Sequence, residues 1–138
     1  MVSTSIKKYR NANAESVVDA NPHQLISIIL KHILSNIAIA HGAISRQEVE
    51  NKGKALTKAI ALVGELQDSL DMEQGGEISA NLFELYDYIV RTLVQANLKN
   101  DSSKLDEVRG LILTVKEGWD AIPADKRVKP TPSVTNQK

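Results

Sequence analysis

Apolar positions recur every three or four residues along four long stretches of the chain, and this spacing predicts an all-α protein. The stretch 75–101 shows the pattern twice, because two neighbouring apolar rows run along it. One row is Ile78, Leu82, Leu85, Ile89 and Leu93, and the other is Phe83, Tyr86, Val90, Val94 and Leu98. A helix with two neighbouring apolar faces needs either a deep position in a core or a partner on its second face. The pattern alone leaves both open.

The first half of the chain carries start signals for two helices. An Asn-Pro pair at 21–22 predicts a helix start, with the asparagine as cap and the proline at the first helical position, and this helix is expected to end near residue 44. Ser45 and Glu48 have the spacing of a capping box, in which each side chain bonds the backbone N–H of the other residue. A second helix is therefore expected from Ser45 to about residue 70.

Both of these helices carry more apolar residues than one narrow row. On the first helix the main row is Ile26, Leu30, Ile33, Ile37, Ala40 and Ile44, and it is widened by Leu25, Ile28 and Ile29. On the second helix the main row is Val49, Gly53, Leu56, Ile60, Val63 and Leu70, beside a flanking row of Ala55, Ala59, Leu62 and Leu66. The small residues of the flanking row would let another helix approach closely.

Two more helices are predicted in the second half of the chain. The glycine pair at 75–76 is expected to supply positive φ angles in the turn before the third helix, which runs to Asp101. Ser103 and Asp106 resemble a capping box at the start of the fourth helix, and Pro123 ends that helix. Four helices with short connections predict an antiparallel up-and-down four-helix bundle.

The two ends of the chain are expected to lie outside this bundle. Residues 1–20 are expected to form a flexible segment, in which Ile6 and Tyr9 would project from one side if the segment turned helical. The bundle is then expected to span 21–122. Residues 123–138 contain three prolines and several lysines, a composition that predicts a disordered tail.

Composition limits the partners and the compartment. The chain of 138 residues suits one domain that can bury a core without disulfides. Lys plus Arg and Asp plus Glu both number 17, so the zero net charge gives no reason to expect a nucleic-acid partner. No apolar run approaches the roughly 20 residues that cross a bilayer, and the first residues show no signal peptide. We therefore expect a cytoplasmic protein with no direct membrane insertion.

Residues with catalytic or metal-binding chemistry form no recognised pattern in this sequence. There is no cysteine, and His23, His32 and His41 do not follow a glutamate by three positions, as a carboxylate di-metal bundle requires. A Gly-x-Ser-x-Gly elbow and a glycine-rich phosphate loop are also missing. We therefore expect no enzyme, cofactor or metal site, and expect the histidines at the surface or rim. Surplus apolar surface on a small bundle instead predicts binding of another helix, or of a disordered segment that folds on binding.

Several motifs resemble the signature of the flagellar secretion chaperone FliS family, in the family's order, over about residues 5 to 122. They are Ile6-x-x-Tyr9, Asn21-Pro22-His23-Gln24-Leu25, Lys52-Gly53-x-Ala55-Leu56-x-Lys58-Ala59, Gly76-Glu77-Ile78, Asn81-Leu82, Leu85-Tyr86-Asp87-Tyr88, Leu93, Ala96-Asn97, Asn100-Asp101, Glu107-Val108, Leu111 and Trp119. One departure is Leu30-Lys31-His32, which stands where members commonly carry an aromatic residue followed by Asp-Gly. This departure leaves the client preference open.

The resemblance implies a chaperone of flagellar export. Members of the family bind the disordered C-terminal segment of newly made flagellin in the cytoplasm and hide the surface that would drive premature filament assembly. They also help deliver flagellin to the type III export gate, including the cytoplasmic domain of FlhA. Their N-terminal segment can lie over the client groove and move aside on binding. The resemblance thus implies flagellin and FlhA as partners and no cofactor.

The candidate client-binding residues are two cap residues and nine apolar positions that the core and a groove could share. They are Ile6, Tyr9, Leu25, Ile28, Ile29, Leu56, Ala59, Val63, Leu85, Tyr86 and Ile89. Two other classes of function remain open from the residues. One is a homodimer whose surplus apolar face is self-complementary. The other is a regulatory protein that binds an anti-sigma factor or another export factor through the same groove.

Overall fold

Four long α-helices make up most of the part of the chain that the computed structural model describes, which is residues 21–127. The elements are α3 (Pro22–Ser45), α4 (Val49–Asp68), α5 (Gly76–Lys99), α6 (Ser102–Asp120) and a 3₁₀ turn, η1 (Ala124–Lys126). Within the described residues no strand is present, and the predicted all-α four-helix architecture is confirmed.

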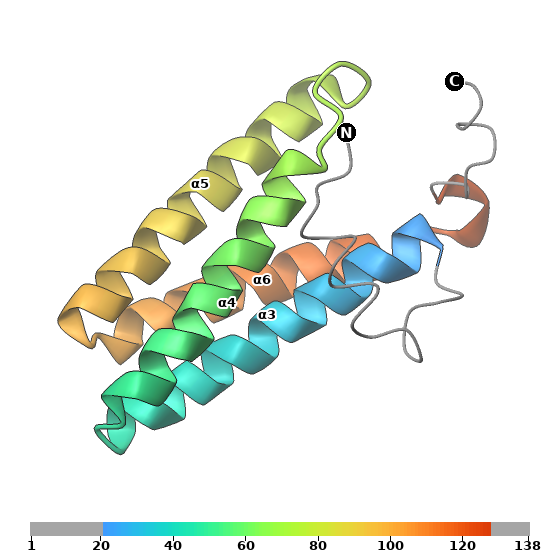
Figure 1. The fold of residues 1–138 in the computed structure, drawn as a ribbon. Helices are drawn as coiled ribbons and strands as arrows, with labels where there is room; N and C mark the ends of the chain where they lie inside the picture. Colours follow the sequence, from blue (N-terminus) through green and yellow to red (C-terminus); the bar gives the residue numbers. More distant parts are fainter. Residues whose placement is uncertain (1–20, 128–138) are drawn as a thin grey trace.

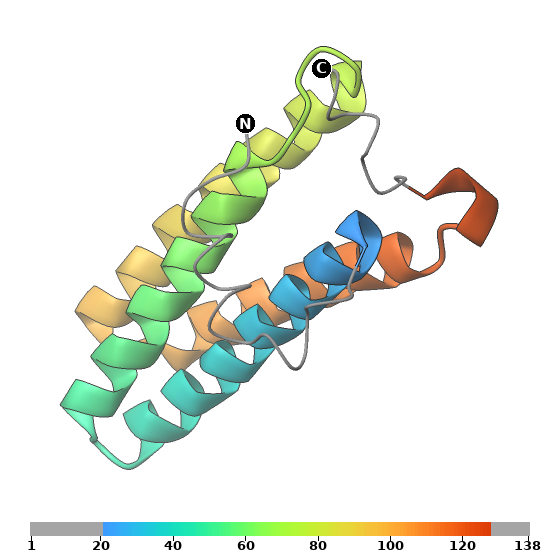
Figure 2. The same cartoon turned by 45° about the vertical axis from the view of Figure 1, so that its right-hand side comes forward.

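The helices form two layers of two. Helix α3 packs against α4 and α6, and α5 packs against α4 and α6. Figures 1 and 2 show the α4–α5 layer crossing the α3–α6 layer at an angle. The layers lie closest at the end that holds the α3–α4 and α5–α6 connections, and they spread toward the other end.

Helix α3 begins as its sequence predicts. The Asn21 side chain accepts a hydrogen bond from the Gln24 backbone N–H at 2.8 Å, and the Gln24 side chain accepts one from the Asn21 N–H at 3.1 Å. Pro22 occupies the first helical position, where the missing N–H costs nothing. This reciprocal cap fixes the point at which the chain enters the bundle.

The predicted capping box at Ser45 is wrong. Ser45 is the last residue of α3, and α4 begins only at Val49, with Glu48 as a cap residue that makes no side-chain bond to the helix. The reason is local competition, because the Glu48 carboxylate accepts hydrogen bonds from Arg46 at 3.1 and 3.2 Å instead. Gln47 has a φ of 59°, so the connection turns sharply within a few residues.

The start of α6 also differs from the prediction. Asp101 is the cap residue, and its Oδ1 accepts hydrogen bonds from the Ser103 backbone N–H at 3.0 Å and the Ser103 hydroxyl at 2.6 Å. Ser103 is therefore a donor inside the first turn and not the cap of a box with Asp106. Asn100 has a φ of 50° and ends α5 in the left-handed region, two residues before α6 begins.

The glycine pair before α5 serves two different purposes. Gly76 has the predicted positive φ, 52°. Gly75 has a φ of −77°, so the predicted positive angle is wrong there. Space is the constraint at Gly75, because an added Cβ would lie 1.8 Å from Ser79 Oγ and 2.8 Å from the Asp71 carbonyl oxygen.

The core lies between the two layers and takes residues from all four helices. It contains Ile29, Leu30, Ile33, Ile37, Ala40, Ala55, Leu56, Ala59, Val63, Leu66, Tyr86, Ile89, Leu93, Ala96, Leu105, Val108 and Ile112. The flanking row of α4 belongs to this core through Ala55, Ala59 and Leu66, as its small residues suggested. Val49 and Ile78 were expected in core rows, but they are 68% and 72% exposed because each stands in the first turn of its helix.

Helix α3 has the length and composition of a membrane span, with a mean hydropathy of 1.5 over its most apolar window. The expectation that no apolar stretch is long enough to cross a bilayer is therefore wrong for α3 by length and composition. Its side chains Leu30, Ile33 and Ile37 are nevertheless buried between the helices of the bundle. Helix α3 thus buries one side in the core, although only 28% of its most apolar window is buried.

The described part of the chain continues past the predicted end of the bundle at residue 122. Residues 124–126 form the 3₁₀ turn, and the Arg127 side chain donates a hydrogen bond to the Ile122 carbonyl oxygen at 2.9 Å. The predicted tail therefore starts too early at residue 123. The N-terminal segment with Ile6 and Tyr9, and the rest of the predicted tail, lie outside the described residues.

The burial pattern on α4 gives a direct test of the core. Leu56 and Val49 share one predicted row, but Leu56 is fully buried and Val49 is exposed. We expect Leu56→Ala to lower the free energy of unfolding by about 2–5 kcal/mol, through lost burial and a residual cavity. Val49→Ala should change it by less than about 0.5 kcal/mol. Urea unfolding followed by circular dichroism measures both, and equal losses would contradict this placement of the two side chains.

Candidate functional site

Most of the predicted client-binding residues of the bundle lie in its core. Ile29, Leu56, Ala59, Val63 and Ile89 have no exposed surface, and Tyr86 has almost none. They fill the space between the layers, so they shape the bundle and offer no surface to a partner. These six positions were expected to be shared between core and groove, and the structure places them on the core side.

Three predicted residues remain partly accessible. Leu25 and Ile28 lie near the start of α3, and Leu85 lies in the middle of α5. Leu25 and Leu85 also pack against the core cluster. Because α3 and α5 belong to different layers (Figure 1), the structure does not bring these three side chains together into one groove.

Helix α5 instead presents an outward apolar row. Phe83, Val94 and Leu98 are 41%, 39% and 72% exposed, and Val90 between them is half-buried. Steps of seven, four and four residues keep these side chains on one side of the helix. Five of the eight large exposed apolar side chains among the described residues lie on α5, which makes it the most apolar outer surface of the bundle.

This row lies along the edge of α5 that faces α4. Gln67 of α4 donates a hydrogen bond to the Phe83 carbonyl oxygen at 3.1 Å, and Lys52 of α4 donates one to the Asn97 carbonyl oxygen at 2.9 Å. Phe83, Val90 and Asn97 are each seven residues apart and therefore follow one edge of the helix. The edge next to α4 is thus the one that carries the apolar row.

The neighbouring surface of α4 carries small residues and is partly apolar. Gly53, Ile60 and Gln67 are also spaced by seven, so they face α5 along α4. Ile60 is half-buried, and an added Cβ at Gly53 or Gly64 would meet no atom within 4 Å. We call the surface made by Gly53, Ile60 and Gly64 of α4 and Phe83, Val90, Val94 and Leu98 of α5 the α4–α5 face.

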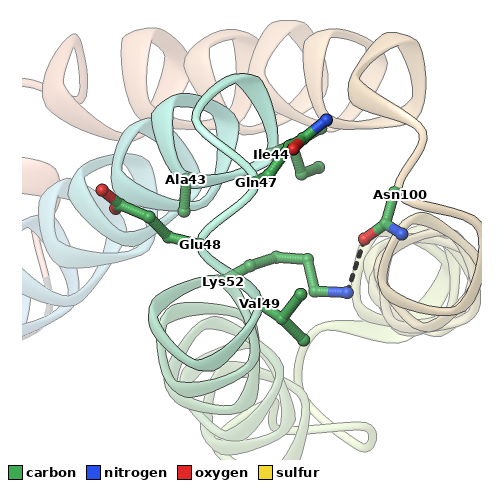
Figure 3. Close-up of a pocket in the computed structure, with 7 residues that line it drawn as sticks. All are labelled: Ala43, Ile44, Gln47, Glu48, Val49, Lys52 and Asn100. Atoms are coloured by element: carbon green, nitrogen blue, oxygen red, sulfur yellow. Dashed lines mark hydrogen bonds between the residues drawn. The ribbon is translucent and has the colours of Figure 1, made fainter.

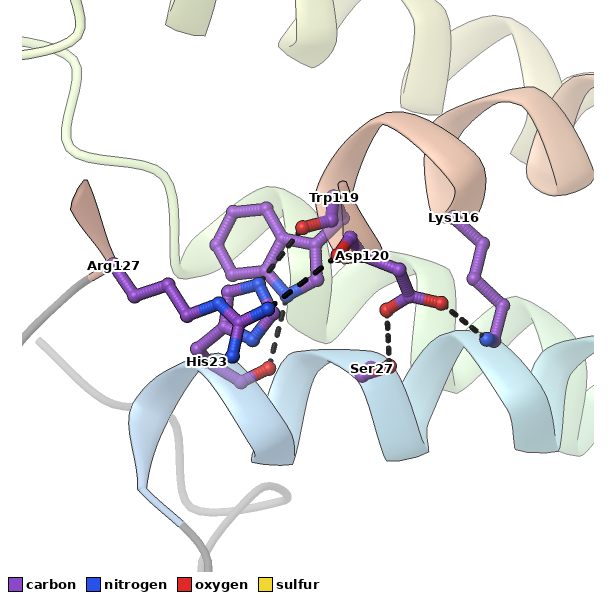
Figure 4. Close-up of polar contacts among 6 residues, drawn as sticks. All are labelled: His23, Ser27, Lys116, Trp119, Asp120 and Arg127. Atoms are coloured by element: carbon purple, nitrogen blue, oxygen red, sulfur yellow. Dashed lines mark hydrogen bonds and ion pairs between the residues drawn. The ribbon is translucent and has the colours of Figure 1, made fainter. Parts of the chain in front are cut away.

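The first turn of α3 is tied to the last turn of α6 by two aromatic rings. Trp119 Nε1 donates to the His23 carbonyl oxygen at 2.9 Å, and His23 Nε2 is 2.8 Å from the Trp119 carbonyl oxygen. The two rings stack with their centroids 4.8 Å apart (Figure 4). His23 is therefore buried, and its predicted place at the surface or rim is wrong.

A second polar contact between α3 and α6 lies one turn further along α3, at Ser27. Ser27 Oγ and Lys116 Nζ each donate a hydrogen bond of 2.6 Å to the Asp120 carboxylate (Figure 4). The bonds from Lys116 and then from Ser27 hold the pKa of Asp120 below its usual value. Together with the ring pair, this contact joins α3 to α6 at the wide end of the bundle.

The remaining histidines lie closer to solvent. His41 pairs with Asp106 at 3.2 Å on the outside of the bundle. Partial burial, and then the neighbouring Lys31 charge, lower the pKa of His32. In residues 21–127 no group of three His, Asp or Glu side chains is arranged to hold a metal ion.

Comparison with known proteins agrees with the resemblance in the sequence. Residues 5–126 match the family described as flagellar protein FliS. The chain is 45% identical over 119 residues to the flagellar secretion chaperone FliSB of Pseudomonas aeruginosa, covering 86% of this chain and 94% of that protein. It is 43% identical over 122 residues to the flagellar secretion chaperone FliS of Salmonella typhimurium, covering 87% and 90%. The FliS of Bacillus subtilis is 34% identical over 120 residues, covering 86% and 89%.

Buried Tyr86 is expected to make the fold sensitive to alkaline pH. Burial raises the pKa of Tyr86 from 10.0 to about 12. The unfolded chain loses this proton first, so the contribution of Tyr86 to stability is complete below pH 10 and falls by up to about 1.4 kcal/mol per pH unit as the pH rises toward 12. Urea unfolding at pH 9 and pH 11 should therefore show a larger loss for the native chain than for Tyr86→Phe. Equal losses in the two proteins would contradict the burial of this hydroxyl.

Proposed function

The chain belongs to the FliS family of flagellar secretion chaperones, which are not enzymes, and on this basis we propose that it binds the C-terminal segment of flagellin before export. Binding of this segment would keep flagellin from polymerising inside the cell. The site of action is then the cytoplasm. The observation that supports this proposal best is the α4–α5 face, an apolar surface that the bundle itself leaves uncovered.

The energetics of this face suit a client that folds as it binds. Ordering a flexible segment costs about 1–2 kcal/mol per residue in backbone entropy. Burial of apolar surface returns about 25 cal/mol per Å², so the client must cover a long apolar row and not a single side chain. The row from Phe83 to Leu98 extends over more than four helical turns. Such a row fits an amphipathic helix laid along the α4–α5 face.

The other candidate residues have secondary places in this proposal. Leu25, Ile28 and Leu85 are partly accessible and would extend the contact onto other helices as the client wraps around the bundle. Ile6 and Tyr9 would act as a cap that moves aside for the client. We further propose that the loaded chaperone presents flagellin to the cytoplasmic domain of FlhA at the export gate.

The α4–α5 face can be tested with paired apolar substitutions. We expect the double change Phe83→Ala with Val94→Ala to weaken binding of flagellin about tenfold or more, because it removes two large apolar side chains from the α5 side of the face. The bundle should still fold, since neither side chain belongs to the core cluster or to the side chains packed against it. Calorimetric titration with flagellin measures the affinity.

Two controls make this experiment specific. Ile39 on α3 is also well exposed and apolar but lies away from the face, so Ile39→Ala should leave the affinity within about twofold. Flagellin without its C-terminal segment should fail to bind the unmodified chaperone. Binding of truncated flagellin at full affinity would refute the proposed client segment. An equal effect of Ile39→Ala would refute the proposed surface. Size-exclusion chromatography of the free chain distinguishes a client site from a homodimer interface.

The cap can be tested separately from the face. Replacing both Ile6 and Tyr9 with alanine should leave the helical content and melting temperature unchanged, because the apolar rows of the four helices do not need these two side chains. The same change should alter the affinity for flagellin or its export. Unchanged affinity together with unchanged motility of cells carrying the variant would rule out a cap role for these two residues.

A further inference from the structure

A pocket of about 470 Å³ lies at the end of the bundle where the two short connections meet. Residues from the end of α3, the start of α4 and the α5–α6 connection line it (Figure 3). They are Ala43, Ile44, Gln47, Glu48, Val49, Lys52 and Asn100. The pocket is far from the His23–Trp119 pair, and only one side of it approaches the end of the α4–α5 face.

The pocket contains a buried ammonium group without an ionic partner. Lys52 is only 6% exposed. Its Nζ donates to the Asn97 carbonyl oxygen at 2.9 Å and to Asn100 Oδ1 at 2.6 Å, both of them uncharged acceptors. Among the described residues no carboxylate pairs with Lys52. An ammonium has three N–H donors, so one donor of Lys52 is left over.

A structural role explains part of this arrangement. Lys52 belongs to the first turn of α4, but its ammonium group lies at the C-terminal end of α5, where the dipole of α5 favours a positive charge. Its two hydrogen bonds also join α4 to α5. That role does not account for the third donor, because a buried charge without an anionic partner retains much of its desolvation cost.

The surroundings of Lys52 favour an anion. Helix α4 begins at Val49 on the pocket wall, and its first backbone N–H groups have no side-chain cap. Glu48 also lines the pocket, but its carboxylate accepts hydrogen bonds from Arg46 and Asn51 and points away from Lys52 (Figure 3). Hydrogen bonding by Arg46 lowers the pKa of Glu48, so Glu48 stays charged and paired with Arg46.

We propose that this pocket binds a carboxylate carried on a short apolar group. One carboxylate oxygen would accept the third N–H of Lys52, and the amide nitrogen of Asn100, which has no partner among the described residues, would donate to the other. Ala43, Ile44 and Val49 would contact the apolar group. The carboxylate could belong to a small acid or to an acidic side chain of a protein, since both present the same chemistry.

Two matched pairs of probes test this site. The first pair is 4-methylpentanoate and its uncharged amide, and the second is a capped peptide with one glutamate between two leucines and the same peptide with glutamine. Each is titrated into the ¹⁵N-labelled full chain, with the Asn100 side-chain amide and the Gln47 backbone amide as reporters. We expect the acids to bind at least tenfold more tightly than the amides, with an affinity that falls as salt is added. Binding of the small acid alone would identify a small-molecule site, and binding of the glutamate peptide would identify a protein contact.

Variants separate the charge of Lys52 from its effect on the fold. Lys52→Met should weaken carboxylate binding at least tenfold, whereas Lys54→Met, which removes the same charge from an exposed position in the next half-turn, should change it less than twofold. Asn100→Gly suits the φ of 50° and so keeps the connection, but it removes the amide donor to the carboxylate, so it should weaken carboxylate binding as read from the Gln47 backbone amide. The proposal is overturned if neither acid binds more tightly than its amide, or if Lys54→Met is as harmful as Lys52→Met. It does not depend on flagellin binding, which is assayed separately.

Discussion

The distance between packed helices is set by the side chains trapped between them, and in this bundle those side chains change in size from one end to the other. Four alanines are buried near the connections, namely Ala40 and Ala43 of α3, Ala55 of α4 and Ala96 of α5. Larger side chains such as Ile29, Leu30 and Leu66 are buried toward the opposite end. The layers therefore meet closely at one end and spread at the other, as Figures 1 and 2 show. The ring pair and the Asp120 contacts then join α3 to α6 at the wide end.

The helices could be predicted from the sequence because their signal is repeated over many residues. An apolar period sustained over twenty positions is robust, whereas a cap depends on a single side chain that has several possible partners. The Glu48 carboxylate bonds Arg46, and Ser103 donates to Asp101, so both predicted capping boxes fail even though the helices near them exist. Likewise, the period places Val49 in the row of Leu56, but it cannot show that the first turn of α4 lies beyond the core.

The binding surface was harder to predict than the fold, because periodicity does not show which of two neighbouring apolar rows is buried and which is exposed. Tyr86 and Val94 belong to one predicted row of α5, yet Tyr86 is buried and Val94 is exposed. Which of the two side chains is buried depends on where α4 and α6 pack against α5. The motifs that identify the family include many core residues, such as Leu56 and Leu93, so they report the fold more directly than the surface. Lys52 is part of such a motif, but its burial without a carboxylate partner is visible only when α5 lies beside it.

The pairing of His23 with Trp119 has a topological consequence. It brings the entrance of the bundle at Asn21 and its exit after Asp120 to the same end, so any segment that precedes or follows the four helices departs from there. Because the two ends of the described bundle lie side by side, a circular permutation is possible in which a short linker joins residue 127 to residue 21 and new ends open in the connection between α4 and α5. The same geometry makes the wide end the natural point for attaching a fluorophore or a surface tether, because the α3–α4 turn then remains in free solvent.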